Sequence, residues 1–353
     1  MRSIICLIFS MRDTVRMLDV AKRLGVSSST VSRALSGSGR ISEKRRKEIV
    51  SVARELGYRP NPMISALIKN RHKKSNFQEV GTIALVTDYP SKGGWQKKDV
   101  CQWEFEGLSK RADEMGFKIE EFPLSKYEYD PLKLEKILRS RGIRGVLLGF
   151  SRNPQRRLDL PTEHFAVAGL SAYFRKSDVD RSNFHGHYNV RLALDTLNSY
   201  GYKKIGLVVP EFNNRISGYL WSGAMLDWQR RLPETCQCNP YIPESDTSFD
   251  SFSFWIEKEK PDALIVYKLP VEKWLQKLGI SIPNDIGVGY LFRSKAEMKR
   301  AAGIDGNLNQ VGATAIDLVI TNLNTNQLGL PKSPKEVLVK GFWRDGATIN
   351  KSK

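Results

Sequence analysis

At 353 residues the chain is too long for one ordinary domain, and its content of 41% hydrophobic and 10% aromatic residues is enough for a sizeable core. The formal net charge is +18, and the excess is concentrated near the start, where residues 1–75 hold 17 Lys and Arg against 5 Asp and Glu. A basic segment of this kind implies a polyanionic partner, either nucleic acid or an anionic membrane.

The first 14 residues contain an apolar run, Ile4–Phe9, that ends before it reaches the length of a signal peptide or a membrane span. We expect residues 1–14 to be an N-terminal extension, with Met11 as the real or an alternative start. The four cysteines are scattered, and the Cys236-x-Cys238 spacing is too tight for the usual zinc or redox motifs. We therefore expect reduced thiols in a cytoplasmic protein.

Residues 15–58 are predicted to form a domain of three short helices. Apolar spacing from Met17 predicts a first helix that stops at Gly25, a residue suited to a left-handed turn. Ser27 is a natural N-cap for a second helix, 28–35, and Ser42 for a third that runs to residue 56. The predicted core consists of Leu18, Val20, Ala21, Leu24, Val26, Val31, Ala34, Leu35, Ile49, Val50, Ala53 and Leu56.

The second helix turns Ser and Arg side chains outward, which suits a helix that enters the major groove of DNA. The alternative is a three-helix bundle with a solvated polar face. The stretches Asp19–Leu35, Arg40–Ser42 and Ala53–Pro62 resemble the LacI/GalR repressor family. The resemblance implies that Ser28 and Ser29 choose the operator bases. The DNA-binding residues expected on this basis are Ser27, Ser28, Ser29, Thr30, Ser32, Arg33, Tyr58, Asn61 and Leu67, with Ser27, Thr30 and Ser32 on phosphates and Arg33 on a base.

Residues 59–75 are predicted to form a hinge. Each residue before a proline is pushed away from helical angles, so the segment 58–62 should be extended and cap a short helix at 63–69. Such a helix is too short to be stable alone, so we expect it to fold only against DNA and a second subunit. The family places a leucine at the position of Leu67 as a wedge in the minor groove that kinks the DNA. The alternative for Leu67 is a core residue, and Ile64 and Ile68 add apolar bulk that the family often lacks.

From residue 76 to 353, short apolar runs alternate with helical patterns, which predicts parallel sheets with ligands at the carboxyl ends of the strands. The predicted strands are 82–87, 118–122, 145–150, 165–170, 204–209, 263–267 and 286–290. The predicted helices are 102–115, 131–140, 188–199, 216–230, 249–258, 271–278 and 308–323.

A change of pattern near residues 171–185 suggests two lobes, and residues 189–207 resemble the start of the family's second lobe. The resemblance implies the type I periplasmic-binding-protein fold, with a small molecule between the lobes. The predicted fold class is an all-α three-helix head plus an α/β core of two lobes with parallel sheets.

The effector site is predicted from a second resemblance: Arg215-Ile-Ser-Gly218-Tyr219 is similar to a family element whose arginine contacts the effector. The alternative for Arg215 is a surface ion pair, and for Trp221 a core position instead of a stacking face. Two departures from the family are Phe184-His185-Gly186, in place of Val-Asp-Asn, and Phe292-Arg293, in place of an acidic pair. The expected effector-binding residues are Arg215, Trp221, Tyr89, Trp103 and Arg293, and the expected effector is a neutral sugar or an anionic sugar derivative.

The sequence contains no nucleophile elbow, Walker loop, HExxH or GxGxxG motif. An enzyme would need a reactive triad or metal set in the cleft, and an exported solute receptor would lack the basic N-terminal segment. His185-x-His187 has no evident third ligand, so we expect no metal and no cofactor. We therefore expect a homodimeric repressor, and not an enzyme, that binds a pseudo-palindromic DNA operator and a small polar effector and does not bind a membrane.

Overall fold

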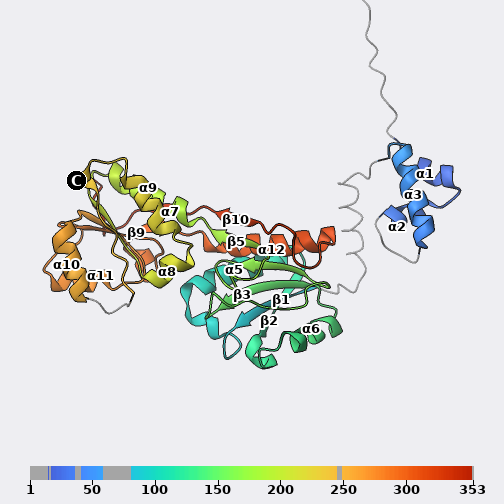
Figure 1. Cartoon of the computed structure of the whole chain (residues 1–353), viewed down its shortest axis with the longest axis horizontal. Coiled ribbons are helices and arrows are strands. Elements are labelled where there is room, and N and C mark those ends of the chain that lie inside the picture. Colours follow the sequence, from blue (N-terminus) through green and yellow to red (C-terminus); the bar gives the residue numbers. More distant parts are fainter. Residues whose placement is uncertain (1–14, 16, 36–40, 59–80, 245–248, 352–353) are drawn as a thin grey trace, which may run out of the picture. The chain divides into compact units, whose positions relative to one another are not determined.

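The computed structural model describes residues 15, 17–35, 41–58, 81–244 and 249–351. The chain divides into two compact units, residues 1–79 and 80–353, and each is described by itself (Figure 1). The predicted N-terminal extension and the predicted hinge helix, with Asn61 and Leu67, lie outside the described residues. In the described parts of the chain, no helix is both long enough and apolar enough to cross a membrane.

The first unit contains the three predicted helices: α1 (Met17–Leu24), α2 (Ser28–Leu35) and α3 (Glu43–Glu55). Gly25 has a φ of +64°, the left-handed angle that the turn after α1 requires. Ser27 Oγ accepts a hydrogen bond from the backbone N–H of Thr30 at 3.2 Å, and Ser42 Oγ accepts one from Arg45 at 3.4 Å. Both predicted N-caps are therefore confirmed.

The core of this unit is formed by Val20, Ala21, Val31, Ala34, Ile49 and Ala53. Two predicted core residues are wrong, because Leu18 is 51% exposed and Val50 is 36% exposed. Met17 and Val52 pack against the core instead. In α1 and in α3 one residue of the predicted stripe is thus replaced by a neighbouring apolar residue, because adjacent apolar residues on a short helix do not define which of them faces inward.

The second unit consists of two α/β lobes, each built on one sheet (Figure 1). The first lobe has a six-stranded parallel sheet in the order β10-β5-β4-β3-β1-β2. Its strands are β1 (Gly81–Asp88), β2 (Phe117–Pro123), β3 (Gly145–Ser151), β4 (Ala166–Leu170), β5 (Asp180–Phe184) and β10 (Glu336–Val339), and its helices are α5 (Asp99–Glu114), α6 (Pro131–Ser140) and α12 (Leu308–Thr325).

The second lobe has a five-stranded sheet in the order β11-β9-β8-β7-β6, in which only β11 is antiparallel to its neighbour. Its strands are β6 (Ile205–Val208), β7 (Ala263–Val266), β8 (Gly287–Tyr290), β9 (Ala302–Asp305) and β11 (Phe342–Arg344). Its helices are α7 (Gly186–Ser199), α8 (Glu211–Ile216), α9 (Leu220–Gln229), α10 (Phe249–Glu259) and α11 (Val271–Lys277). Short 3-10 helices lie at Gly94–Lys97, Leu124–Tyr127, Glu234–Cys236 and Glu297–Lys299.

The chain crosses between the lobes after β5, before α12 and between β10 and β11, and hydrogen bonds connect the crossings after β5 and after β10. The N–H of His185 donates to the carbonyl of Val339 at 2.8 Å, and the N–H of Gly341 donates to Asn189 Oδ1 at 2.9 Å. A Cβ at position 341 would lie 2.5 Å from the carbonyl oxygen of Asp305, so only glycine fits there. The crossings therefore form one packed junction between the two lobes.

The seven predicted strands and six of the seven predicted helices of this unit are present, with shifts of a few residues at their ends. The predicted helix 216–230 corresponds to α9, but its predicted start is wrong, because Gly218 (φ +72°) and Tyr219 (φ +60°) interrupt the helical backbone and separate α9 from α8, which was not predicted. Four strands, β5, β9, β10 and β11, were not predicted.

Candidate DNA-binding face and ligand cavity

The start of α2 presents a cluster of hydroxyl groups. Ser27 Oγ lies 2.8 Å from Ser29 Oγ and 2.9 Å from Thr30 Oγ1. One helical turn on, Arg33 donates from Nε to the carbonyl of Ser29 at 3.2 Å. Positions 28, 29, 32 and 33 share one side of the helix, and the side chains of Ser29 and Arg33 are exposed. The α2 face thus offers small hydrogen-bonding groups and one cation to an external partner.

The charges of the first unit favour the binding of an anionic partner. The first turn of α2 contains no acidic residue, so the partial positive charge of the helix N-terminus is not neutralised there. Lys44, Arg45, Arg46 and Lys47 follow one another in α3. Tyr58, predicted to contact DNA, is half-buried and packs against the core of the unit, with its N–H donating to the carbonyl of Ala53 at 2.9 Å. Its predicted contact with DNA stays a prediction.

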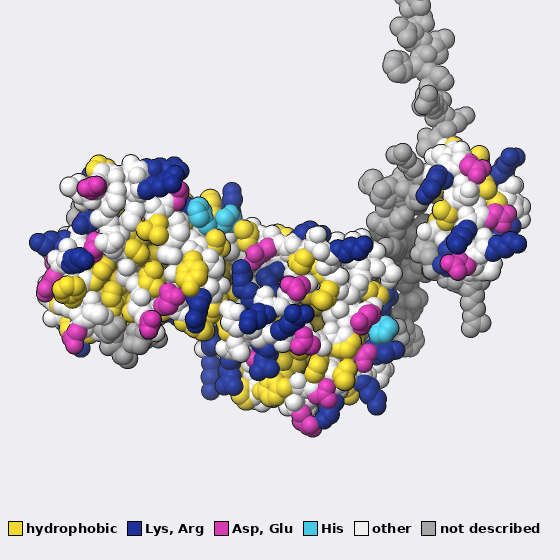
Figure 2. Space-filling view, viewed as in Figure 1, with side chains coloured by type: hydrophobic (Ala, Val, Ile, Leu, Met, Phe, Trp, Pro, Cys, Tyr) yellow, Lys and Arg dark blue, Asp and Glu magenta, His cyan; other side chains and the backbone are white. Residues whose placement is uncertain are grey.

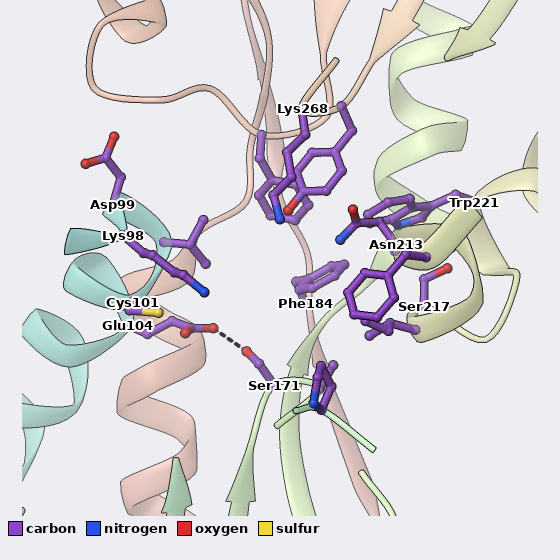
Figure 3. Close-up of a pocket in the computed structure, with 18 of the residues that line it drawn as sticks. Lys98, Asp99, Cys101, Glu104, Ser171, Phe184, Asn213, Ser217, Trp221 and Lys268 are labelled. Carbon is purple, nitrogen blue, oxygen red and sulfur yellow. Dashed lines mark hydrogen bonds between the residues drawn. The ribbon is translucent and has the colours of Figure 1, made fainter. Parts of the chain in front are cut away.

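A cavity of about 640 Å³ lies between the two lobes of the second unit (Figure 3). Much of its wall comes from the segments that follow β3, β4, β5, β7 and β8, which is the carboxyl edge where ligands of parallel sheets bind. The α5, α8 and α9 helices complete the wall. The volume falls within the range of about 300–1,000 Å³ that is typical of small-molecule sites.

Four aromatic rings from different elements form an apolar wall in this cavity. Trp221 packs edge-on against Tyr267 with ring centroids 5.0 Å apart, and Phe292 packs edge-on against Phe184 at 4.8 Å. The Tyr267 and Phe292 rings, 5.6 Å apart, join the two pairs. Edge-to-face pairs hold their rings in fixed orientations, so this wall is preorganised for the flat face of a ligand.

A polar group stands in the first-lobe wall of the cavity. Glu104 of α5 accepts hydrogen bonds from the hydroxyl of Ser171, at the end of β4, and from the hydroxyl of Tyr173 at 3.1 Å (Figure 3). The Cys101 thiol lies 3.2 Å from the same Tyr173 hydroxyl. Glu104 is 1% exposed, and this burial raises the pKa of its carboxyl to about 7, although both hydrogen bonds act in the opposite direction.

The position of Glu104 depends on a close approach of two helices. A Cβ at Gly312 of α12 would lie 2.0 Å from the carbonyl oxygen of Glu104, and a Cβ at Gly107 of α5 would lie 1.8 Å from the carbonyl oxygen of Asn309. Both positions therefore require glycine. The contact fixes the part of α5 that carries Glu104 against α12.

Arg293, at the second-lobe side of the cavity, is 6% exposed. Its Nη1 donates to the carbonyl of Ala301 at 3.3 Å, and its Nε has no hydrogen-bond partner among the described residues. Burial lowers the pKa of the guanidinium below its usual value. An unsatisfied buried donor of this kind is costly until a ligand atom or water meets it.

Three of the five predicted effector-binding residues line the cavity: Trp103, Trp221 and Arg293. The expectations for Arg215 and Tyr89 are corrected, because neither residue is in the cavity wall. The α8 helix turns Asn213, Ile216 and Ser217 toward the cavity, so the intervening Arg215 is exposed on its other side. Tyr89 is 5% exposed and packs in the core of the first lobe.

Several residues of the cavity wall were not predicted from the sequence, namely Lys98, Glu104, Ser171, Tyr173, Asn213 and Lys268. Ser171 and Lys268 directly follow strands that were predicted, so the rule for strand ends identifies their positions. Glu104 lies on the buried side of α5 with Cys101 and Leu108. An acidic residue within an apolar helical stripe is the signal that could have found it.

His185, one of the two histidines in the His185-x-His187 pattern, has a structural contact at the start of α7. His185 caps α7, with Nδ1 accepting a hydrogen bond from the N–H of Tyr188 at 3.3 Å. Among the residues that the structure describes, no group of three or more His, Cys, Asp or Glu side chains is arranged to hold a metal ion.

Comparisons with known proteins give matches to both units of the chain. Residues 16–61 match the family model "Bacterial regulatory proteins, lacI family". The transcriptional regulator DegA of Bacillus subtilis is 33% identical over 132 residues, which is 36% of this chain and 34% of DegA. The transcriptional repressor CytR of Escherichia coli is 24% identical over 314 residues, which is 77% of this chain and 78% of CytR. The lac repressor dimer bound to operator and an anti-inducer shares the fold, with a TM-score of 0.53 at 17% identity over 95% of this chain and 99% of the repressor.

The head thus matches a family of DNA-binding regulatory proteins, and the two-lobed α/β unit has the periplasmic-binding-protein-like fold of the lac repressor. Residues 16–61 are thus a helix-turn-helix domain of the LacI family, and the chain as a whole is similar to regulators of that kind. Its relatives are named as transcriptional regulators and repressors, and not as enzymes.

Proposed function

We propose that the chain is a transcriptional repressor that binds a pseudo-palindromic operator as a homodimer and responds to a small molecule in the cavity between its lobes. The observation that carries the proposal is the exposed α2 face, with hydroxyl groups and Arg33, inside the segment 16–61 that matches the family model. In this proposal Ser28, Ser29 and Arg33 read base edges in the major groove. Ser27, Thr30 and Ser32 bind the flanking phosphates.

Exposed apolar side chains on the second unit support the dimer. Leu132 on α6 is 64% exposed and Phe254 on α10 is 69% exposed. Figure 2 shows apolar side chains on the visible surface of both lobes. In this proposal these exposed apolar side chains are candidate contacts with the second copy. Two recognition helices related by a two-fold axis then require two inverted half-sites in the DNA.

The lining of the cavity supports the proposed response to a small molecule. It is lined by residues of both lobes, so a bound molecule would change the free energy of one arrangement of the lobes relative to another. The lac repressor, which shares the fold, is named as bound to an operator and an anti-inducer. In our proposal a ligand between the lobes changes the geometry of the dimer and hence its affinity for the operator.

Selection of bound sequences from a pool of random duplexes tests this function. The purified full chain should recover an inverted repeat whose half-sites are separated by a fixed spacing. Recovery of random DNA, or of one asymmetric site, would contradict the proposal. Because the selection needs no ligand, its result does not depend on the identity of the effector.

A further inference from the structure

Aromatic side chains are concentrated in the wall of the cavity between the lobes. Eight of the 30 residues that line the cavity are aromatic, compared with 10% of the whole chain. Four of them, Phe184, Trp221, Tyr267 and Phe292, form the connected rings described above, and we call these four the ring wall. Phe184 ends a strand of the first lobe and the other three come from the second lobe, while Phe184 and Phe292 pack against the apolar cores of both. The ring wall therefore spans the two lobes.

Most hydroxyl groups in the cavity wall already donate their proton to another group of the protein. A hydroxyl group has only one proton to donate. The five that donate it within the protein, out of seven in the wall, belong to Ser151, Ser171, Tyr173, Ser217 and Tyr290. A sugar would bring several hydroxyl groups that each need a partner, and a buried polar group without a partner costs free energy. The wall therefore favours a ligand with few polar groups.

The charged residues of the wall do not require a charged ligand. Four cations and three carboxylates line the cavity. Lys98 Nζ lies 5.6 Å from the centre of the Tyr89 ring, and Lys268 Nζ lies 5.0 Å from the centre of the Tyr267 ring, so both lysines stand over rings of the protein. Because both signs of charge are present, an ion of either sign would meet repulsion as well as attraction. An uncharged ligand avoids that repulsion.

Glu104 supplies a hydrogen-bond acceptor across the cavity from the ring wall. Figure 3 shows Glu104 on one side of the space and Phe184 and Trp221 on the other. Burial, and after it the charge of Glu104, raises the pKa of the Tyr267 hydroxyl, so Glu104 also lies near this part of the ring wall. Each oxygen of the Glu104 carboxyl accepts one hydrogen bond from the protein and has a second lone pair. Glu104 can therefore accept a hydrogen bond from the edge of a ligand that lies on the rings.

We propose that the cavity binds an uncharged aromatic molecule whose ring lies on the ring wall and whose edge donates a hydrogen bond from an O–H or N–H group to Glu104. Aromatic pairs attract one another beyond the area that they bury, because the positive edge of one ring meets the negative face of another. Since the ring wall spans both lobes, the bound ring stabilises one arrangement of the lobes relative to others. This inference rests on the proposed function and names the class of effector for the same cavity.

Matched pairs of small molecules test the aromatic ring alone. The first pair is 4-hydroxybenzyl alcohol and 4-(hydroxymethyl)cyclohexanol, and the second is 4-hydroxybenzamide and 4-hydroxycyclohexanecarboxamide. The members of each pair carry the same groups on an aromatic or a saturated ring. In calorimetric titrations of the full chain, we expect the aromatic member of at least one pair to bind with a Kd roughly three- to tenfold below that of its saturated twin, the scale of one aromatic contact.

Two further probes test the hydroxyl groups. Ribose and glucose have more hydroxyl groups and no aromatic ring, and both should bind more weakly than the preferred aromatic molecule. In contrast, 1,4-dimethoxybenzene keeps the ring and has no O–H or N–H donor. It should bind roughly threefold or more weakly than the preferred aromatic molecule, because Glu104 then has no donor to accept from.

Two variants locate the aromatic contact. Phe184→Leu and Phe292→Leu keep an apolar side chain and remove its ring, and each should weaken binding of the preferred aromatic molecule roughly threefold or more, while the saturated twin binds as before. Phe254→Leu makes the same substitution at a 69% exposed position of α10 outside the cavity wall, so it is the matched control and should bind as the wild type does. Cooperative melting without ligand shows that each variant is folded, and either cavity variant alone is sufficient for the test.

The inference is overturned if each saturated twin binds as tightly as its aromatic partner, if a sugar binds more tightly than every aromatic probe, or if no probe binds. Equal losses of affinity in Phe254→Leu and in the cavity variants would also contradict it, and tight binding of 1,4-dimethoxybenzene would contradict the role of Glu104. These results would leave the operator selection untouched. A protein that selects no inverted repeat would instead contradict the proposed function, whatever its ligand.

Discussion

Arg181, in β5, donates a hydrogen bond of 2.9 Å from Nη1 to the carbonyl oxygen of Ser171, the residue whose hydroxyl donates to Glu104 in the cavity. The same guanidinium also donates to the carbonyls of Tyr173 at 2.6 Å and Phe174 at 3.1 Å. Ser171 (φ +46°) and Phe174 (φ +49°) both have left-handed backbone angles. Such angles cost about 1–3 kcal/mol each unless the surroundings enforce them. Arg181 therefore holds in place the loop that carries Ser171 and Tyr173 to the cavity.

The first prediction is that Arg181→Met lowers the free energy of unfolding by about 2–4 kcal/mol. The substitution leaves three carbonyl oxygens without this donor, and each unsatisfied buried group costs about 1–3 kcal/mol, partly offset by removing a buried cation. Urea unfolding followed by tryptophan fluorescence is the measurement. Arg139→Met, which removes an exposed pair with Glu135, is the control and should change stability by less than about 0.5 kcal/mol. Equal effects of the two substitutions would contradict this role of Arg181.

A second prediction concerns the pH dependence of stability. Burial raises the pKa of Glu104 from 4.5 to about 7, so between these values the folded chain holds a proton that the unfolded chain has lost. Stability contributed by Glu104 is therefore present at low pH and is lost as the pH rises through this window, by about 3 kcal/mol in total.

Glu104→Gln removes this titration. The unfolding free energy of the variant relative to the wild type should rise by about 3 kcal/mol between pH 4.5 and pH 7.5. Glu106→Gln, at an exposed position of the same helix, should show no such change. A constant difference between wild type and Glu104→Gln across this range would show that Glu104 titrates normally.

The elements of the second unit that could be predicted from the sequence are those with a continuous apolar signal. The β3 strand, Gly145–Ser151, is buried throughout and is mostly apolar, so it was predicted. The β5 strand is also buried but reads Asp-Arg-Ser-Asn-Phe, which has no apolar pattern. Its polar groups are satisfied by distant partners: Asp180 accepts from the N–H of Lys335, and Ser182 donates to the carbonyl of Val311. Hydrophobic periodicity cannot detect a strand that is stabilised by long-range hydrogen bonds.

The candidate sites, too, could be predicted only where local sequence rules determine the structure. The helices and caps of the DNA-binding head follow from local rules, because Gly25 and Ser27 act on their immediate neighbours. The cavity depends on which side of a helix faces the other lobe. Arg215 and Asn213 are two residues apart on α8, yet only Asn213 lines the cavity. The break after α8 sets that orientation, and it was not predicted.

A third prediction addresses the proposed dimer. Leu132→Glu and Phe254→Glu place a charge on exposed apolar positions of α6 and α10, and either should shift the chain toward the monomer if a second copy covers that position. Light scattering coupled to size-exclusion chromatography measures the mass. Ser140→Glu, which places the same charge at an exposed polar position of α6, is the control. A dimer that survives both substitutions would place the interface elsewhere.

Leu67 lies outside the described residues, and its predicted role as a wedge in the minor groove gives a fourth prediction. Leu67→Ala should weaken binding to the selected operator by about 1–3 kcal/mol, the scale of the contacts that a kinked base step permits. Binding to random DNA at low salt should stay nearly unchanged, because phosphate attraction comes from Lys and Arg. Fluorescence anisotropy with the two duplexes separates these effects. Equal losses on both would argue that Leu67 only stabilises the fold.

The central claim, that α2 reads the operator bases, is tested most directly by repeating the DNA selection with a variant in which Ser28 and Ser29 are both replaced by alanine. The account predicts that wild type and variant both recover an inverted repeat of the same spacing, with changed base preferences at the same symmetric positions in each half-site. Ser51→Ala, on the exposed side of α3, should keep the wild-type preference. An unchanged preference in the double variant would contradict the claim and would place the base-reading surface elsewhere on the chain.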